Sequence, residues 1–371
     1  MNNKTFQPPN RILLGPGPSN VHPRVLEAMS RPTIGHLDPR FIELMDDIKS
    51  LLRYTFQTEN ELTFPVSGPG SVGMETCLVN LVEPGFKVIV CINGVFGGRM
   101  KEIVQRCGAT PIVVEDTWGT AVSPQKLEET LKANKDAKVV AFVHAETSTG
   151  AKSDIKLLTE IAHKYDCLTI ADTVTSLGGI PVKIDEWNID ASYSGTQKCL
   201  SCPPGLSPVT FNEKAVNFIK NRKTKVQSWF MDINLIINYW SGGAKRSYHH
   251  TAPINSLYGL HEALLLLQEE GLENSWKRHG EVSQGFVDSL KKINLEPYVK
   301  KEERLPELVA VKIPDGVDDA KVRTSLLNDF GIEIGAGLGS LAGKIWRVGL
   351  MGYSCNKENV DKCIAAFEKT L

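Results

Sequence analysis

The sequence has almost no excess charge and few cysteines. Its formal net charge is -1 over 371 residues, whereas nucleic acids and acidic membranes select partners with a basic surplus. We therefore expect no nucleic-acid partner. Eight cysteines in a chain of this length are too sparse for a disulfide framework and suit a reducing compartment, so we expect a cytoplasmic protein.

Long apolar runs are also missing. The first ten residues, MNNKTFQPPN, contain no apolar core of the kind found in a signal peptide. No run approaches the roughly 20 apolar residues that a membrane-spanning helix needs. We therefore expect no association with a membrane. Hydrophobic residues still make up 42% of the chain, which is enough to bury a substantial core.

Short apolar runs alternate with helix-like segments over most of the chain. Strand-like runs occupy residues 61–66, 87–93, 110–115, 138–145 and 167–174, and helix-like patterns occupy residues 74–82, 99–108, 123–134 and 153–166. Strand–helix alternation with short links is typical of a mostly parallel sheet with right-handed crossovers. The sequence therefore predicts an α/β fold whose ligands bind at the carboxyl ends of the strands.

The pattern changes after about residue 255. A long helical stretch is followed by a strand, a helix, a strand and a final helix, which predicts a compact α+β unit. We expect three parts: an N-terminal segment over residues 1–20, a large domain over residues 21–254 and a small domain over residues 255–371.

A glycine motif follows the first strand-like run. Gly68, Gly70 and Gly73 form G-x-G-x-x-G at the start of a helix, where free N–H groups and the helix dipole favour a phosphate. A dinucleotide site would need an acidic residue about 20 positions further on, but Asn93 stands there. A single phosphate, a dinucleotide and a plain tight turn all stay open.

Two residues in neighbouring units could hold a cofactor. Asp172 ends a buried strand, and a buried carboxylate needs a partner such as a metal, an arginine, a protonated ring nitrogen or a helix to cap. Lys198 follows in YSGTQKCLSCPPG, residues 193–205; a desolvated lysine attacks carbonyls. Together with the glycine motif, this pair suits pyridoxal phosphate.

Other patterns allow different chemistry. Cys199 and Cys202 form a lone C-x-x-C, and a structural zinc usually needs four ligands. His249 and His250 could complete the set, but adjacent residues of a strand point to opposite faces. A metal or redox binding protein is therefore the alternative from another class. Arg347, in the strand-like KIWRVGL, could bind a carboxylate bidentately or lie on the surface of a strand.

Motifs along the whole chain resemble one family. They are LLGPGPSNVHPRV, SGPGS, NGVFGGR, HAETSTG, ADTVTSLGG, YSGTQKCLSCPPG, SYHHTAP and GLGSLAGKIWRVGLMGY. The sequence is similar to the class V, fold-type I pyridoxal-phosphate aminotransferases, and within them to the alanine–glyoxylate and serine–pyruvate group. The resemblance implies a large domain with a mostly parallel sheet, a small C-terminal domain and a homodimer of amino-acid metabolism with shared active sites.

The resemblance also implies roles for individual residues. Lys198 and Asp172 would be catalytic, with Lys198 on the cofactor aldehyde and Asp172 on the ring nitrogen. Arg347, Ser148 and Gly35 would bind the substrate. The implied cofactor-binding residues are Lys198, Gly70, Ser71, Phe96, Ser148, Asp172, Val174, Gln197, Tyr248 and Thr251.

Some of these positions have special features. Tyr248 and Thr251 would reach the phosphate of the neighbouring subunit, and Gly35 with His36 would line the substrate entrance from the partner. The N-terminal segment would also contact the partner. Phe96 stands where many relatives have tryptophan, and Pro69 where relatives often have serine. No metal is implied.

The implied function is transfer of an amino group from alanine or serine to glyoxylate or pyruvate by a ping-pong mechanism. Within the family, ureidoglycine–glyoxylate or kynurenine-type transaminases remain alternatives. A cysteine desulfurase-like lyase is another, with Cys355 as the only loop cysteine near the Arg347 strand. A dehydrogenase is a further alternative.

Overall fold

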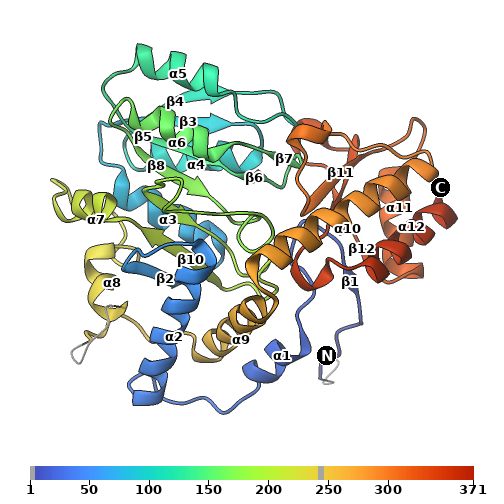
Figure 1. The fold of residues 1–371 in the computed structure, drawn as a ribbon, viewed down its shortest axis with the longest axis horizontal. Helices are drawn as coiled ribbons and strands as arrows, with labels where there is room; N and C mark the ends of the chain where they lie inside the picture. Colours follow the sequence, from blue (N-terminus) through green and yellow to red (C-terminus); the bar gives the residue numbers. More distant parts are fainter. Residues whose placement is uncertain (1–4, 241–245) are drawn as a thin grey trace.

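The computed structural model describes residues 5–240 and 246–371. Across these ranges the largest sheet has seven strands in the order β2–β10–β9–β8–β5–β3–β4 (Figure 1). Its strands are β2 (Leu62–Ser67), β3 (Lys87–Ile92), β4 (Thr110–Glu115), β5 (Ala137–Val143), β8 (Leu168–Asp172), β9 (Ala191–Tyr193) and β10 (Leu206–Phe211). The five strands predicted from the sequence are all present.

The pairing confirms the prediction of a mostly parallel sheet. The pairs β3–β4, β3–β5, β5–β8 and β8–β9 are parallel. Only β10 runs antiparallel to both of its neighbours, β2 and β9, in the described sheet. Strand β10, which contains Pro208, was not predicted from the sequence. That proline lies one residue beyond the point where β9 ends, so its missing N–H interrupts no β9 pairing.

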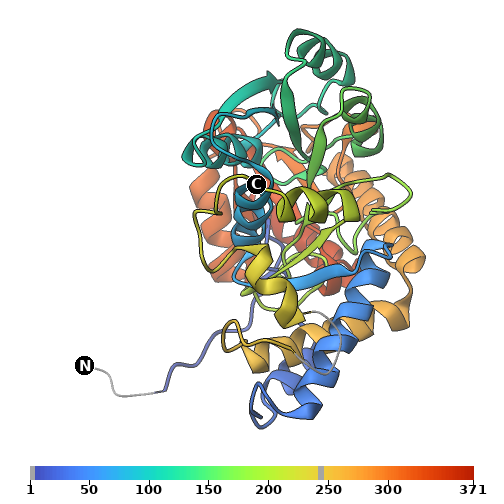
Figure 2. The same ribbon diagram turned by 90° about the vertical axis from the view of Figure 1, so that its left-hand side faces the viewer.

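Helices cover both faces of this sheet (Figures 1 and 2). The helices of this part of the chain are α1 (Pro23–Met29), α2 (Pro39–Phe56), α3 (Gly70–Leu81), α4 (Val95–Arg106), α5 (Pro124–Ala133), α6 (Ile155–His163), α7 (Glu213–Lys220), α8 (Ile233–Trp240) and α9 (Ile254–Glu270). As predicted, α5 begins after Ser123, whose hydroxyl accepts a hydrogen bond from the N–H of Lys126 at 3.3 Å.

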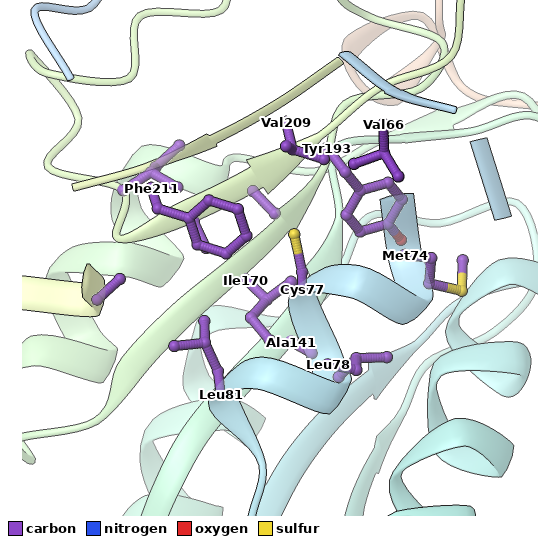
Figure 3. Close-up of a cluster of buried hydrophobic side chains, with 14 of the residues drawn as sticks. Val66, Met74, Cys77, Leu78, Leu81, Ala141, Ile170, Tyr193, Val209 and Phe211 are labelled. Atoms are coloured by element: carbon purple, nitrogen blue, oxygen red, sulfur yellow. The ribbon is translucent and has the colours of Figure 1, made fainter. Parts of the chain in front are cut away.

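Most residues of helix α3 are buried. Met74, Cys77, Leu78 and Leu81 point from α3 toward the sheet, where Tyr193 is among the residues that meet them (Figure 3). A helix that is apolar on several sides packs in a core rather than at the surface. Its N-terminus is therefore fixed at the carboxyl ends of the neighbouring strands.

A second apolar core forms near the C-terminus. The three-stranded antiparallel sheet β11–β14–β13 packs against helices around Phe286, Trp346 and Phe367. The elements are α10 (Leu272–Lys292), β11 (Leu308–Lys312), α11 (Asp319–Asp329), β12 (Ile332–Glu333), β13 (Gly335–Ala336), β14 (Ile345–Gly349) and α12 (Lys357–Thr370). The predicted order of helix, strand, helix, strand and helix is confirmed, with the long helical stretch divided at Gly271.

Residues 12–20 form a strap that joins the two cores. Strand β1 (Ile12–Leu13) pairs in parallel with β12, and the N–H of Gly349 donates to the carbonyl of Leu14 at 2.8 Å. Further along, the Ser19 hydroxyl donates to the carbonyl of Lys198 at 2.7 Å. The strap therefore ties the C-terminal sheet to the Lys198 loop.

The domain boundaries at residues 20 and 254 stay a prediction. Residues 1–4, part of the expected N-terminal segment, lie outside the described residues. A membrane-spanning helix is not found among the described helices, each of which is too short or too polar.

Candidate active site

Several strands end at one edge of the sheet and carry the candidate residues there. Strand β8 ends at Asp172, β9 is followed by the loop of Lys198, and β5 is followed by the loop of Ser148. Helix α4, with Phe96 in its first turn, begins just after β3. Because parallel strands place their carboxyl ends on the same edge, these residues converge.

Asp172 is buried and held by two donors. Its Oδ1 accepts a hydrogen bond from the N–H of Val174 at 2.9 Å, and its Oδ2 accepts one from the Tyr193 hydroxyl at 2.7 Å. Burial raises the pKa of Asp172 to about 6, against the effect of these donors and of Lys198. A cationic partner at this carboxylate would favour its ionised form.

Lys198 is confined by the strap. The residue is only 8% exposed, and its Nζ donates a hydrogen bond to the carbonyl of Pro16. Burial and the nearby guanidinium of Arg347 lower the pKa of Lys198 to about 8, although Asp172 opposes this shift. Near neutral pH a much larger share of the amine is therefore unprotonated than in an ordinary lysine, and this form attacks carbonyls.

The N-terminus of α3 has the features of an anion site. Its N-cap residue, Pro69, supplies no side-chain hydrogen bond to the first turn in the described structure. A Cβ on Gly70 would lie 3.3 Å from Cγ2 of Val174, so the backbone there lies close to Val174. The side-chain oxygen of Gln197 is buried and lacks a partner among the described residues. The free N–H groups of the first turn fit a phosphate group. Gln197 would add a donor only through its NH2 group, because its unpaired oxygen is an acceptor.

Ser71 and Phe96 both contact Arg99 of α4. The Ser71 hydroxyl accepts a hydrogen bond from Nη1 of Arg99 at 3.0 Å. The Arg99 guanidinium carbon lies 5.1 Å from the centroid of the Phe96 ring, within range of a cation–π contact. These contacts bring the first turns of α3 and α4 together.

Ser148 is hydrogen-bonded to the carboxylate of Glu146, a residue that was not predicted to belong to the site. Its hydroxyl donates to Oε1 of Glu146 at 2.6 Å and accepts a hydrogen bond from the N–H of Val95 at 3.0 Å. Glu146 belongs to the quoted motif HAETSTG. Its place directly after a buried strand was the signal that could have identified it, as it did for Asp172.

Arg347 reaches this loop from the second core. It lies on β14 with its residue 7% exposed, and its Nη1 donates to the carbonyl of Thr147 at 3.3 Å while Nε donates to that of Ala336 at 2.7 Å. Burial lowers the pKa of Arg347 to about 10, and the carboxylate of Glu146 acts in the opposite direction. The guanidinium therefore stays cationic at neutral pH and can bind a carboxylate.

Three predicted residues lie apart from this cluster. Tyr248 is 63% exposed, and its ring centroid lies 5.3 Å from that of His36, next to Gly35. Its hydroxyl lies 3.4 Å from the Thr251 hydroxyl. In the described chain these residues contact one another rather than Asp172 or Lys198.

The two cysteines of the C-x-x-C are buried thiols. Cys199 donates to the carbonyl of Thr175 at 3.2 Å. Burial raises the pKa of Cys199 well above its ordinary value and that of Cys202 to about 12. Over residues 5–240 and 246–371, no group of three or more His, Cys, Asp or Glu side chains could hold a metal ion.

The prediction that His249 and His250 point to opposite faces of a strand is wrong. Residues 246–253 form no strand, and Nδ1 of His249 lies 2.8 Å from Nδ1 of His250. The ring of His249 stacks on Trp229 at a centroid distance of 4.6 Å. Contacts with aromatic side chains therefore fix the two rings in a loop.

Known proteins similar to this chain match nearly all of it. The model of the family described as Aminotransferase class-V matches residues 12–362. The alanine–glyoxylate aminotransferase of Rattus norvegicus is 42% identical over 99% of this chain and 89% of its own length. The (S)-ureidoglycine–glyoxylate transaminase of Bacillus subtilis (strain 168) is 39% identical over 98% and 91%. A crystal structure of alanine–glyoxylate aminotransferase from Nostoc sp. has a TM-score of 0.97 at 47% identity and covers 100% of this chain and 97% of that one.

Proposed function

Because this chain belongs to the class V aminotransferases, we propose that it moves the amino group of alanine or serine to glyoxylate or pyruvate with pyridoxal phosphate as its cofactor. The chain is an aminotransferase with the fold-type I architecture. Alanine and glyoxylate are the substrates named for its relatives, and serine and pyruvate follow from the resemblance of its sequence motifs. The observation that carries the proposal is the convergence of buried Asp172 and Lys198 beside the uncapped N-terminus of α3.

The residues of the site suit this cofactor. When bound, pyridoxal phosphate supplies a ring that withdraws electrons from the carbon bearing the amino group. The N-terminus of α3, with Gly70, Ser71 and Gln197, would bind the phosphate. Asp172 would hold a proton on the ring nitrogen, because an ionised carboxylate stabilises a cation at hydrogen-bond distance. Phe96 and Val174 would cover the two ring faces, and Ser148 would lie beside the phenolic oxygen.

Lys198 and Arg347 would act on the substrate. The guanidinium of Arg347 would bind the α-carboxylate and so orient the amino acid. The free amine of Lys198 would take the proton from the substrate Cα and deliver it to the cofactor carbon that had carried the aldehyde. A positioned general base of this kind contributes about 10²–10⁴-fold to a rate. Its lowered pKa supports this role.

We also propose that two copies of the chain complete each other's sites. Tyr248, Thr251 and Gly35 lie apart from the Lys198 cluster and are exposed, which supports their assignment to the phosphate and the substrate entrance of a neighbouring subunit. The same proposal includes contact between residues 1–20 and the partner, and a division into residues 21–254 and 255–371. The thiols are free, which supports a reducing compartment such as the cytoplasm.

Dimerisation can be tested by shared-site complementation. A Lys198→Ala chain and a Tyr248→Ala chain would be mixed, with each alone as the control. Mixed dimers should recover activity, since one of their two sites has both residues intact. Activity that never exceeds the sum of the separate chains would count against a shared site.

The lyase alternative is weakened by the position of Cys355. The residue is buried, and burial raises the pKa of its thiol to about 12. A nucleophilic cysteine needs an accessible thiolate. The ureidoglycine alternative concerns only the amino donor, and the relative from Bacillus subtilis keeps it open.

The proposal is tested by an absorbance titration of the purified protein. Alanine, serine and ureidoglycine are added in turn, each followed by glyoxylate. We expect a yellow band that alanine or serine bleaches and glyoxylate restores, and no such band in Lys198→Ala. A response to ureidoglycine alone would replace the proposed donor. A protein that stays colourless after pyridoxal phosphate is added would overturn the proposed chemistry.

A further inference from the structure

Glu146 is a fully buried carboxylate that joins two parts of the site. Its Oε1 accepts hydrogen bonds from the N–H of Ser148 at 3.0 Å and from the Ser148 hydroxyl at 2.6 Å. Its Oε2 accepts one from the N–H of Phe96 at 3.2 Å. One side chain therefore contacts both the residue predicted beside the ring's phenolic oxygen and the residue predicted on the ring face.

While Glu146 is ionised, these hydrogen bonds determine which acceptor receives the hydroxyl proton of Ser148. A serine hydroxyl has a single proton to donate, and an ionised carboxylate only accepts. Ser148 therefore donates to Glu146 and already accepts from the N–H of Val95. The hydroxyl can therefore offer a bound molecule only a lone pair and no proton. If Glu146 were protonated on Oε1, it could donate to Ser148 and release the hydroxyl proton toward the ligand.

Glu146 also caps α4 from outside the helix. The N-cap residue, Gly94, has no side chain to accept hydrogen bonds from the first turn. The Ser148 hydroxyl and Glu146 accept the N–H groups of Val95 and Phe96 instead. A negative charge at a helix N-terminus is favoured by the helix dipole. The orientation of Phe96 therefore depends on this carboxylate.

We propose that Glu146 is a positioning residue that turns the Ser148 hydroxyl into an acceptor toward the bound ring and holds the turn that carries Phe96. This inference rests on the proposed function, because it takes the ligand at Ser148 to be pyridoxal phosphate. The protonation state of Glu146 then sets which form of the ring's phenolic oxygen the site favours.

The charged groups around Glu146 make its ionisation sensitive. Asp172 on β8 disfavours a second negative charge, whereas the cations of Lys198 and Arg347 favour it. The Tyr193 hydroxyl on β9 stays uncharged, because burial and Asp172 raise its pKa. Burial raises the pKa of Glu146 to about 7, and the hydrogen bonds from Ser148 oppose this shift. A change of net charge at any of these groups is therefore transmitted to Ser148.

The test is the pH dependence of the absorbance of the bound cofactor. Pyridoxal phosphate is added to the apoprotein of the wild type, Glu146→Gln, Ser148→Ala and the double variant, and spectra are recorded across the pH range. In Glu146→Gln we expect the midpoint of the absorbance change to fall by about one pH unit, because a nearby negative charge is removed. The shift caused by Glu146→Gln should be smaller when Ser148 is already alanine, because the hydroxyl is the route of the coupling.

Glu83 provides a matched control. It lies beyond the opposite end of α3, and its Oε2 likewise accepts two backbone N–H groups and a hydroxyl, from Lys223 and Thr224. Glu83→Gln should leave the midpoint unchanged. A loss of folding alone therefore cannot produce the expected pattern.

The outcomes separate this inference from the proposed function. If the wild type binds no pyridoxal phosphate, both the proposed function and the role of Glu146 are overturned. A wild type that binds it, with the same midpoint in Glu146→Gln or an equal shift in both Ser148 backgrounds, would overturn only the role of Glu146. If Glu146→Gln does not fold, Glu146→Asp takes its place. The shorter side chain withdraws the carboxylate from Ser148 and should shift the midpoint, and an unchanged midpoint would overturn the role of Glu146.

Discussion

At the scale of single residues, the surroundings of Lys198 predict how the apoprotein reacts. Only the unprotonated amine attacks an aldehyde. The pKa of Lys198 is lowered to about 8 by burial and by Arg347, so the unprotonated form becomes dominant above this pH. We expect the rate at which the apoprotein takes up pyridoxal phosphate to rise with pH and to level off above about 8.

Stopped-flow absorbance measures this rate. Lys198→Arg keeps the positive charge without an amine and should show no covalent uptake. A rate that keeps rising toward pH 10 would mean that Lys198 titrates like a lysine in water and would contradict the confinement described for it.

Glu307 predicts a pH dependence of stability. Both of its carboxylate oxygens are buried without a hydrogen-bond partner among the described residues, and burial raises the pKa of Glu307 to about 8 from an ordinary value of 4.5. The unfolded chain loses this proton near the ordinary pKa, but the folded chain retains it. Rising pH between these two values therefore favours unfolding, by up to about 1.4 kcal/mol for each pH unit.

Glu307→Gln removes the titration and keeps the shape of the side chain. We expect the melting temperatures of the variant and the wild type to be similar near pH 5 and the variant to be the more stable near pH 8. Differential scanning calorimetry of the apoproteins checks this. A difference that is constant with pH would show that Glu307 ionises normally in the folded chain.

At the scale of secondary-structure elements, Gly94 is required by space at the start of α4. A Cβ on Gly94 would lie 2.5 Å from the Ser148 hydroxyl and would collide with the Glu146 side chain. We expect Gly94→Ala to destabilise the protein by about 1–3 kcal/mol and to weaken cofactor binding, because Phe96 would move with the helix. Thermal melting and titration with pyridoxal phosphate measure the two effects.

Gly98, one turn further along α4, is the control for this substitution. A Cβ there would meet no described atom within 4 Å. Gly98→Ala should therefore be neutral or should stabilise the helix by up to about 1 kcal/mol. If both variants behaved alike, the packing of Gly94 on the Ser148 loop would not be the cause.

The elements predicted from sequence were those with strong local signals. Residues 61–66 and 167–174 were identified as strands because apolar runs between turns identify buried strands, and Ser123 with Pro124 marked the start of α5. Strand β10 contains Pro208 and was not identified, although Pro65, its partner in β2, did not prevent the identification of residues 61–66. Only the position of β10 beside the end of β9 makes Pro208 acceptable.

At the scale of the whole molecule, the strap makes the surroundings of Lys198 depend on both cores. Gly17 of the strap has a φ of 104°, which residues with a Cβ rarely adopt. A Cβ on Gly17 would also lie 2.8 Å from Nζ of Lys198. We therefore expect Gly17→Ala to displace the strap from Lys198 and to slow cofactor uptake, measured by absorbance.

Gly15 is the matched position in the same strap. A Cβ there would meet its nearest neighbour, Oε1 of Glu333, at an ordinary 3.8 Å. Gly15→Ala should therefore take up the cofactor like the wild type. Equal losses in both variants would indicate a general weakening of the strap rather than a contact at Lys198.

The partners of the site residues could not be predicted from sequence. Asp172 and Lys198 were identified because each stands in a distinctive local setting. Tyr193 has ordinary neighbours in sequence and donates to Asp172 from another strand. Glu146 has a local signal in its place after a strand, but its hydrogen bond with the N–H of Phe96, 50 residues away, has none. Hydrogen-bond partners of this kind are set by the packing of strands and helices, which no local pattern reports.

The strap also bears on the order in which the protein takes shape during synthesis. Ile12 pairs with Ile332, so the strap leaves the ribosome long before its partner strand has been made. Until β12 and β14 have been translated, the second core cannot hold the carbonyl of Pro16 against Nζ of Lys198. Arg347, which lies on β14, is also still missing. The nascent chain thus carries the Lys198 amine in an unfinished site until residues 332–349 have been translated.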